Sequence, residues 1–433
     1  MTAESSPEFM ALSVIQDIQQ ENWENQAKYV AETSLFFQDL WQGVVPPQRL
    51  EDLPTLPLSD KSMLRISQQN HPPFGNYLAS PDERVNRLHR TSGTTGQAMN
   101  LALSAKDALQ TATIGARAQS AAGLGPKDRV VHCLNYQMWM GGFTDHCTLE
   151  ATGALVIPYG VGGTEKLIRT IQELEITAIS CTPSYPKVLE QVIAEKFPGL
   201  SPRDLGLRLG LFGGEAGLDD LSYRKRLEDT WGFGVRNANY GVSDVFCNFA
   251  SQCGENNDLH YMAMDVLYPE LIDPETAEPI DWKEGQTGEL VLTHLEKECQ
   301  PLVRFRTGDI ITLTGVNEAC SCGRTAPRFK VVGRSDDMIV VRGLNIFPTG
   351  LAATINSFLE LSGEYLVVLQ GHGPFDELPL EVEVGEGFEL SERLQLKIAE
   401  TIKRDLGATA KVTLLDHGSL PRTEGKTRRV IRK

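Results

Sequence analysis

The sequence has few cysteines, no long apolar run and no excess of positive charge. Its 433 residues contain 8 cysteines, far too few for a secreted scaffold held by disulfides. No apolar run approaches the roughly 20 residues of a membrane-spanning helix, and residues 1–20 lack the pattern of a signal peptide. The formal net charge is −16, whereas nucleic-acid-binding domains usually present a basic face. We therefore expect a cytoplasmic protein that binds neither nucleic acid nor membrane.

The order of strand-like and helix-like segments predicts an α/β fold. The chain is too long for one compact core, so two or more domains are expected. Residues 11–40 have helical apolar spacing, and "SDKSML" (59–64) is typical of a capped helix start. Between residues 129 and 214, β-rich runs alternate with helical stretches, which indicates mostly parallel sheet flanked by helices.

The carboxy-terminal part of the sequence has a different pattern of predicted strands and helices. After residue 284 the strand-like runs are short and separated by turns, and the final hundred or so residues mix helix and strand patterns. We place a boundary near Asp336. The predicted organisation is a large amino-terminal domain, residues 1–335, followed by a small, mobile α+β domain, residues 336–433.

The stretch "TSGTTG" (91–96) is dense in hydroxyl groups and glycine. Its glycines would let backbone N–H groups approach an anion closely, and its hydroxyls add further donors. The stretch is not a Walker loop, because Gln97 stands where that motif has lysine, and it is not a G-x-G-x-x-G fingerprint. From these residues alone, a phosphate loop and a polar surface turn are equally compatible. A phosphate loop here would need positive charge from a metal or from another domain.

Four later stretches give the glycine-rich loop a context. In order, they are "NYGVSD" (239–244), "RFRTGDI" (304–310), "GRSDDMIVVRGLNIFP" (333–348) and "LPRTEGKTRRV" (420–430). Each is a weak signal alone, but the ordered series resembles the adenylate-forming superfamily, and most of all its phenylacetate-CoA ligase group, from about residue 50 to the end. The resemblance implies an ATP-dependent, AMP-forming acid–CoA ligase. Its substrate would be an aryl or arylacetic acid such as phenylacetate, activated through an acyl-adenylate.

Two alternatives follow from the same motifs. An adenylating enzyme could pass the acyl group to an amine or a carrier-protein thiol instead of coenzyme A, and its first half-reaction would be identical. A non-catalytic nucleotide-binding regulator would be marked by loss of Lys426 or Asp309, and both residues are present. Relatives in the superfamily often form dimers, so a homodimer is a further expectation.

The resemblance also assigns roles to residues of the nucleotide site. The loop would hold the β- and γ-phosphates of ATP through Thr91, Ser92, Gly93, Thr94, Thr95 and Gly96. Tyr240 would stack on adenine beside Gly241, with Gly213, Gly214 and Glu215 lining the same pocket. Asp309 would accept hydrogen bonds from the ribose hydroxyls, assisted by Arg334.

The small domain and the metal carboxylate complete this set. Lys426 would be the lysine missing from the loop, delivered when the small domain closes; Asp336 would be the hinge, and Gly343 would line the tunnel for coenzyme A. Asp244 would help to hold Mg²⁺ near the α-phosphate. The family commonly has Glu at this position, and Asp is one methylene shorter. The alternative for Asp244 is an ordinary exposed loop aspartate.

Two further groups of residues stand out. "NYQMWMGGF" (135–143) lies where the family forms its acyl pocket, so Tyr136, Met140 and Gly141 are candidates for contact with the acid, although such clusters are more often plain core. Cys253, His260, Cys320 and Cys322 would make a structural Cys₃His zinc site. The alternative for the cysteines is that they are free and buried.

Overall fold

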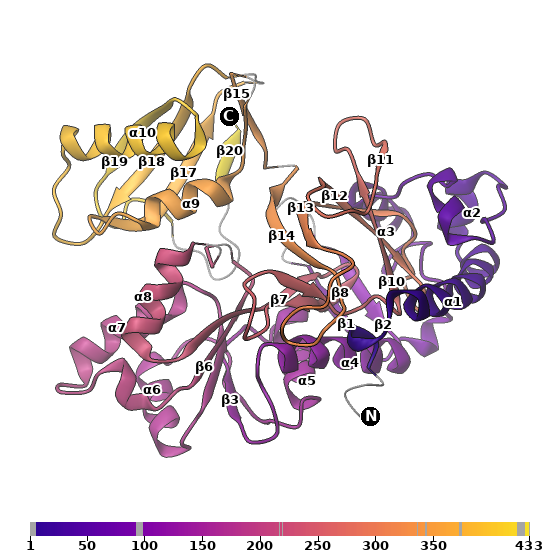
Figure 1. Ribbon diagram of the computed structural model, residues 1–433, viewed down its shortest axis with the longest axis horizontal. Helices are drawn as coiled ribbons and strands as arrows, with labels where there is room; N and C mark the ends of the chain where they lie inside the picture. Colours follow the sequence, from indigo (N-terminus) through magenta and orange to yellow (C-terminus); the bar gives the residue numbers. More distant parts are fainter. Residues whose placement is uncertain are drawn as a thin grey trace. The chain divides into compact units, whose positions relative to one another are not determined.

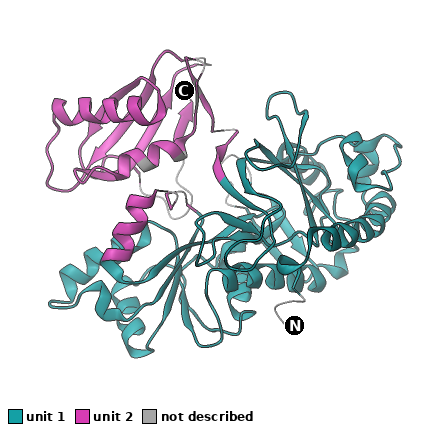
Figure 2. Ribbon diagram, viewed as in Figure 1, with its two compact units in different colours: residues 1–214, 230–330 teal, residues 215–229, 331–433 magenta. Residues whose placement is uncertain are grey.

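The computed structural model describes residues 6–91, 98–215, 217–218, 220–335, 337–342, 344–371, 375–421 and 429–432. The chain forms two compact units, which Figure 2 colours separately. The first contains residues 1–214 and 230–330, and the second contains residues 215–229 and 331–433. Among the residues described, no helix is both long enough and apolar enough to cross a membrane.

The amino-terminal part of the first unit is helical, as the apolar spacing predicts. Its elements are η2 (Pro7–Phe9), α1 (Leu12–Thr33), α2 (Leu35–Trp41), η3 (Leu50–Thr55), α3 (Lys61–Asn70) and η4 (Asp82–Arg84). The predicted cap at the start of α3 is confirmed. The Asp60 side chain accepts hydrogen bonds from the backbone N–H groups of Ser62 and Met63, at 2.8 and 3.0 Å.

One twelve-stranded sheet organises the first unit, with strand order β11-β10-β12-β13-β14-β9-β8-β7-β6-β5-β3-β4. Figure 1 labels several of its strands, among them β3, β6, β7 and β8. The run β7-β6-β5-β3-β4 is parallel throughout. These strands are β3 (Arg129–His132), β4 (Leu155–Pro158), β5 (Ala178–Cys181), β6 (Leu209–Gly213) and β7 (Gly234–Val242). Their buried side chains, including Val130, Ala178, Leu209 and Leu211, form one apolar cluster.

The strands beyond β7 pair mainly antiparallel. They are β8 (Phe246–Ser251), β9 (Leu259–Tyr261), β10 (Leu267–Ile272), β11 (Pro279–Ile280), β12 (Thr287–His294), β13 (Phe305–Gly315) and β14 (Arg328–Arg334). A separate hairpin, β1 (Arg87–Arg90) with β2 (Asn100–Leu103), flanks the glycine-rich loop. The sheet therefore changes from parallel to antiparallel at β7.

Helices join and cover the parallel strands. They are α4 (Ala105–Ala121), the π-helical turn η5 (Met140–Thr144), α5 (Asp145–Glu150), α6 (Thr164–Glu173), α7 (Tyr185–Lys196) and η6 (Pro202–Leu205). Helix α8 (Leu221–Trp231) connects β6 to β7 in the sequence, and its residues 221–229 belong to the second unit. Helix α4 starts with a capping box between Ser104 and Asp107 and packs against β7, β8 and α5.

The second unit has a small core of its own. The four-stranded sheet has the order β19-β18-β17-β20, and a two-stranded hairpin, β15 with β16, precedes it in the chain. The elements are β15 (Ile339–Val341), β16 (Leu344–Ile346), α9 (Pro348–Asn356), β17 (Leu361–Leu369), β18 (Leu378–Val384), α10 (Glu392–Leu406), β19 (Ala410–Leu415) and β20 (Val430–Arg432). Helices α9 and α10 pack on β17 and β19, burying Leu351, Ile398 and Val367.

The predicted fold class is confirmed, with a refinement. The strand–helix alternation between residues 129 and 214 gives the parallel half of the sheet, and a separate carboxy-terminal sheet follows. The sheet as a whole is mixed rather than mostly parallel, because the short strands after residue 242 are joined by turns rather than by helices. The exact domain boundary, residues 335/336, stays a prediction, since Asp336 lies outside the described residues.

Candidate active site

Two of the predicted nucleotide residues meet in the first unit. Tyr240 lies near the end of β7 and Asp309 lies on β13, 69 residues further along the chain. The Tyr240 hydroxyl donates a hydrogen bond to Asp309 Oδ2 at 2.8 Å. Asp309 is only 8% exposed, and its backbone N–H donates to Thr307 Oγ1. The fold therefore joins the tyrosine and the carboxylate that the motifs suggested separately.

The Tyr240 ring is fixed by two other aromatic rings. Phe249 on β8 and Phe329 on β14 each lie with their ring centres 5.3 Å from that of Tyr240, in edge-to-face geometry. Such pairs favour one ring orientation over others. The packing therefore presents Tyr240 in a defined orientation before any ligand binds.

Two glycines near Tyr240 have no room for a side chain. A Cβ on Gly213, the last residue of β6, would lie 2.5 Å from the Cβ of Asn239, and one on Gly241 would lie 1.9 Å from the carbonyl oxygen of Cys247. Gly214 follows with a φ of +81°, which favours glycine, and Glu215 comes directly after it. These positions let backbone approach backbone beside the candidate adenine site.

Asp244 lies in the turn between β7 and β8, and only one of its two carboxylate oxygens has a hydrogen-bond partner. Its side chain is 3% exposed, and Oδ2 is 2.6 Å from the Nζ atom of Lys61. Oδ1 is buried and has no hydrogen-bond partner. A buried carboxylate oxygen with an open position suits a hard divalent cation such as Mg²⁺. The residue is not the exposed loop aspartate of the alternative interpretation.

Only the base of the glycine-rich loop is among the described residues. Thr91 and Met99 face each other there: the Thr91 N–H donates to the Met99 carbonyl, and the Met99 N–H donates to Thr91 Oγ1, both at 3.0 Å. This pairing closes the base of the loop. Arg334 ends β14. The remaining predicted residues lie outside the described part of the chain, namely Ser92, Gly93, Thr94, Thr95, Gly96, Asp336, Gly343 and Lys426.

The candidate acid-binding residues lie at a π-helical turn, an irregularity frequent at functional sites. Gly141 is half-buried, and a Cβ there would find nothing nearer than 3.9 Å. The Tyr136 hydroxyl lies 2.9 Å from His146 Nδ1. Met140 is buried, in an apolar cluster that contains Leu101, Leu103, Ala108 and Cys247. Tyr136 and Gly141 are therefore more open to a ligand than Met140.

His132 supports this turn from β3. Its Nε2 atom lies 3.1 Å from the carbonyl oxygens of both Gly141 and Gly142, and its Nδ1 atom lies 3.0 Å from Ser180 Oγ. Complete burial lowers the pKa of His132 to about 4, so the ring is neutral at pH 7. Since carbonyls only accept, Nε2 carries the proton and donates to the turn. The sequence reasoning missed this residue.

A buried carboxyl, Asp145, was also missed. It starts α5, accepts a hydrogen bond from Cys247 Sγ at 3.1 Å and is hydrogen-bonded by the side-chain amide of Asn239. Burial raises its pKa to about 7, against the opposing effect of these two bonds. The available signal was spacing: Asp145 lies four residues after Gly141, so a helical turn brings the two to one face.

The four predicted metal ligands do come together. The ligand atoms of Cys253, His260, Cys320 and Cys322 all lie within 4.8 Å of one another. The Sγ atoms of Cys253 and Cys320 are 3.9 Å apart, and Cys322 Sγ is 3.6 Å from His260 Nε2. Tetrahedral Zn²⁺ with bonds of about 2.3 Å to sulfur needs S···S separations of about 3.8 Å. The donor set and its spacing fit a closed, four-coordinate zinc site.

The metal cluster is linked to the nucleotide residues and to the amino terminus. His260 on β9 pairs with Arg328 on β14, and the next residue, Phe329, packs on Tyr240. On the other side, the backbone N–H groups of Thr325 and Ala326 donate to the Glu8 carbonyl. The cluster therefore lies where the β13–β14 connection, β9 and η2 converge.

Comparison with known proteins identifies the family. The family of AMP-binding enzymes matches residues 61–294, and the AMP-binding enzyme C-terminal domain matches residues 343–433. The phenylacetate-coenzyme A ligase of Thermus thermophilus is 37% identical over 439 residues, covering 96% of this chain and 95% of the relative. That of Escherichia coli is 34% identical and covers 90% and 87%.

Solved structures of a 2-hydroxyisobutyryl-CoA ligase are also similar. Its postadenylation state, in complex with 2-HIB-AMP, has a TM-score of 0.87 at 29% identity, covering 98% of this chain and 91% of that one. Its thioesterification state, in complex with 2-HIB-AMP and CoA, has a TM-score of 0.70 at 30% identity, with the same coverage. The chain belongs to the AMP-binding enzyme family and, within it, to the phenylacetate-coenzyme A ligases.

Proposed function

We propose that this protein is an ATP-dependent, AMP-forming acid–CoA ligase that activates an aryl or arylacetic acid such as phenylacetate. The observation that carries the proposal is the hydrogen bond between Tyr240 and Asp309. Tyr240 lies near the end of β7, and Asp244 lies in the turn that follows this strand. A ring for adenine, a carboxylate for ribose and a carboxylate for a metal thus come from the motifs that define the family.

In the first half-reaction, a carboxylate oxygen of the acid attacks the α-phosphorus of ATP, and the bond to pyrophosphate breaks. No protein nucleophile is needed, so the protein contributes positioning and charge neutralisation. Tyr240 would stack on adenine, and Asp309 would accept from the ribose hydroxyls. Asp244 would hold Mg²⁺ through its unpartnered Oδ1, and that ion would neutralise phosphate charge. Lys426 would add a second positive charge.

In the second half-reaction, the thiol of coenzyme A attacks the acyl carbon, and AMP leaves. Two reactions that share one site need an exchange of the surface that covers it. We propose that the small domain, residues 336–433, turns at Asp336, withdraws Lys426 and brings Gly343 to the pantetheine tunnel. The supporting observation is that residues 331–433 belong to a compact unit with its own core.

The acid would lie against the turn at residues 140–144. Gly141 belongs to that turn, Tyr136 precedes it, and the His132 Nε2–H group donates to its carbonyls. An aromatic ring would gain from burial against Tyr136, so an aromatic acid should give the highest kcat/KM. A clear preference for long-chain fatty acids would refute this part of the proposal.

We also propose that the Cys₃His cluster holds one structural Zn²⁺. All four positions of a tetrahedral ion would be filled by Cys253, His260, Cys320 and Cys322, which leaves no position for a reacting water. Zinc would join β9 to the loop before β14 and so steady Phe329 against Tyr240. Its role would be stability, with an indirect effect on ATP binding.

A screen of pyrophosphate release over aromatic, arylacetic and aliphatic acids tests the function. Each acid is assayed with and without coenzyme A, and thioester is measured separately. Pyrophosphate release with an aromatic acid, together with thioester formed only when coenzyme A is present, is the expected result. Release without thioester, followed by transfer to an amine or a carrier-protein thiol, would select the alternative acceptor. No release with any acid would refute adenylation.

The assembly and location of the protein are part of the same proposal. We expect a cytoplasmic enzyme, because none of the eight cysteines is in a disulfide. We also expect a homodimer, which sedimentation of the purified protein would test.

A further inference from the structure

Lys61 is a positive charge on the first unit that faces the metal carboxylate. It is the first residue of α3, and its Nζ atom lies 2.6 Å from Asp244 Oδ2. The Lys61 side chain is 36% exposed, whereas that of Asp244 is 3% exposed. The ammonium group therefore lies between a buried carboxylate and solvent.

The position of Lys61 is set by a rigid backbone support. Ser59, two residues earlier, donates its N–H to the Arg304 carbonyl and accepts at its own carbonyl from the Arg306 N–H, at 3.0 and 2.8 Å. Its hydroxyl donates to the Val303 carbonyl at 2.9 Å. The start of α3 is thereby attached to the beginning of β13, the strand that carries Asp309.

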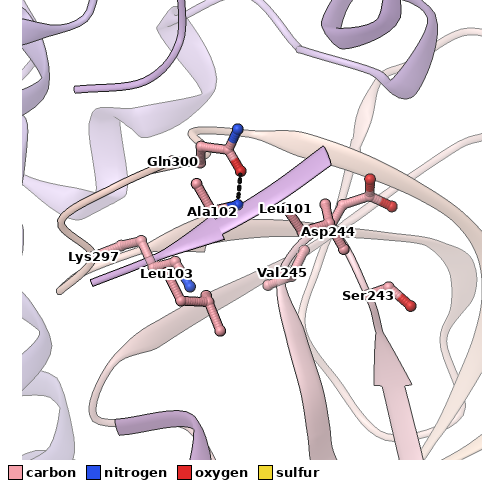
Figure 3. Close-up of a pocket in the computed structure, with 8 residues that line it drawn as sticks. All are labelled: Leu101, Ala102, Leu103, Ser243, Asp244, Val245, Lys297 and Gln300. Carbon is pink, nitrogen blue, oxygen red and sulfur yellow. Dashed lines mark hydrogen bonds between the residues drawn. The ribbon is translucent and has the colours of Figure 1, made fainter. Parts of the chain in front are cut away.

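The same helix is attached to the strand that leaves the glycine-rich loop. The Gln68 side chain on α3 accepts from the Asn100 N–H and donates to the Asn100 carbonyl, at 2.9 and 2.7 Å. Strand β2 starts at Asn100, and its residues Leu101–Leu103 face Ser243–Val245 across a small cavity (Figure 3). Helix α3 thus links three parts of the candidate site: the loop strand, the Asp244 turn and the Asp309 strand.

The ion pair does not have the form expected of a purely structural one. A structural pair with a buried carboxylate normally satisfies both of its oxygens. Asp244 Oδ1 is instead buried without a partner. Lys61 is also incompletely used: an ammonium group has three protons, and among the described residues Asp244 is the one hydrogen-bond acceptor found for it. The carboxylate can therefore accept one more interaction at Oδ1, and the ammonium group can donate further hydrogen bonds.

We propose that Lys61 is a resident phosphate-binding cation of the adenylation site, which orients Asp244 through Oδ2 while Oδ1 takes the metal. This inference rests on the proposed function. It gives the large unit a permanent positive charge for the triphosphate, whereas Lys426 would be present only when the small domain closes. It also explains how an aspartate can serve where the family commonly has glutamate: Lys61 holds the shorter side chain in place.

The test compares Lys61→Gln with wild type in three measurements. Calorimetric titration with Mg·ATP, without acid, should show affinity at least tenfold weaker. Pyrophosphate release should slow by about 10- to 100-fold, because a charge that acts on the reacting phosphates is lost. Thioester formation from supplied acyl-adenylate should stay within about threefold, since no triphosphate takes part in that step. Lys61→Arg, which keeps the charge, should recover most of the lost ATP affinity.

Lys106→Gln is the matched control. Lys106 also makes an ion pair of 2.6 Å, with Glu296, near the start of a helix, but both partners are exposed. This control should bind Mg·ATP like wild type.

Three results would overturn the inference. These are ATP affinity within twofold of wild type in Lys61→Gln, equal losses in both half-reactions, or loss of cooperative thermal unfolding in that variant. A wild-type protein that releases no pyrophosphate with any acid would refute the proposed function instead. An active wild type matched by Lys61→Gln would refute only the role of Lys61.

Discussion

Replacing Tyr240 by phenylalanine removes one hydroxyl and leaves the stacking ring in place. The lost hydroxyl donates to Asp309 Oδ2 at 2.8 Å, and a hydrogen bond to a charged group contributes about 1.5–3 kcal/mol. This bond is already formed in the free protein, so ATP affinity falls only as far as Tyr240 and Asp309 lose their order; at about 1.4 kcal/mol per factor of ten, the full loss sets an upper limit of roughly 10- to 100-fold. Asp309 keeps its other contacts, so it is not left without partners. We therefore expect the lower end, about tenfold weaker binding of Mg·ATP.

The assay is calorimetric titration with Mg·ATP, combined with thermal unfolding of the free protein. Tyr29→Phe is the matched control: the Tyr29 hydroxyl donates to the Glu298 backbone carbonyl at 2.9 Å, away from the Tyr240–Asp309 pair. The control should lose a little stability and no ATP affinity. Unchanged ATP binding in Tyr240→Phe, or equal weakening in the control, would refute the assignment of this pair to the nucleotide.

Three further substitutions test the remaining roles. Lys426→Ala should slow acyl-adenylate formation by about 100-fold or more, because a charge used in the transition state is lost, while thioester formation from supplied acyl-adenylate largely survives; equal damage to both steps would contradict the assignment. Asp336→Pro would fix φ near −65° and should reduce thioesterification while adenylation persists; normal rates for both would show that the pivot lies elsewhere. Wild type purified without added metal should contain about one zinc per chain by elemental analysis, and Cys322→Ser should lose it together with thermal stability; metal-free wild type with titratable thiols would contradict the site.

The regular part of the fold could be predicted because its pattern is local. The strands and helices between Arg129 and Gly213 follow from β-rich runs alternating with helical spacing, and each element is read within a few residues. The long antiparallel half of the sheet could not be predicted in the same way. Its order, in which β9 lies beside β14, depends on pairing between residues distant in sequence, such as Leu259 and Phe329.

The residues of the candidate site also differ in whether a local sequence pattern could predict them. Tyr240, Asp309 and the Cys/His ligands belong to motifs that can be recognised one stretch at a time. Lys61 and Asp145 do not, because their importance arises only from partners far away in the chain, Asp244 and Asn239. A lysine after a helix cap and an aspartate on a short helix are common in sequences. Only the fold shows that each one faces a residue of the site.

The change of direction at β7 has a consequence for how new specificities can be obtained. Neighbouring residues of an extended strand point to opposite faces, and on β7 Asn239 bonds to Asp145, the first residue of α5, while Tyr240 bonds to Asp309. If the proposed roles hold, one strand would separate the site for the acid from the site for the nucleotide. A library that varies residues 135–144 together with Asn239 would then alter the proposed acid site and leave Tyr240 and Asp309 unchanged. On the proposed roles, the choice of acid could change without a change in the residues that bind ATP.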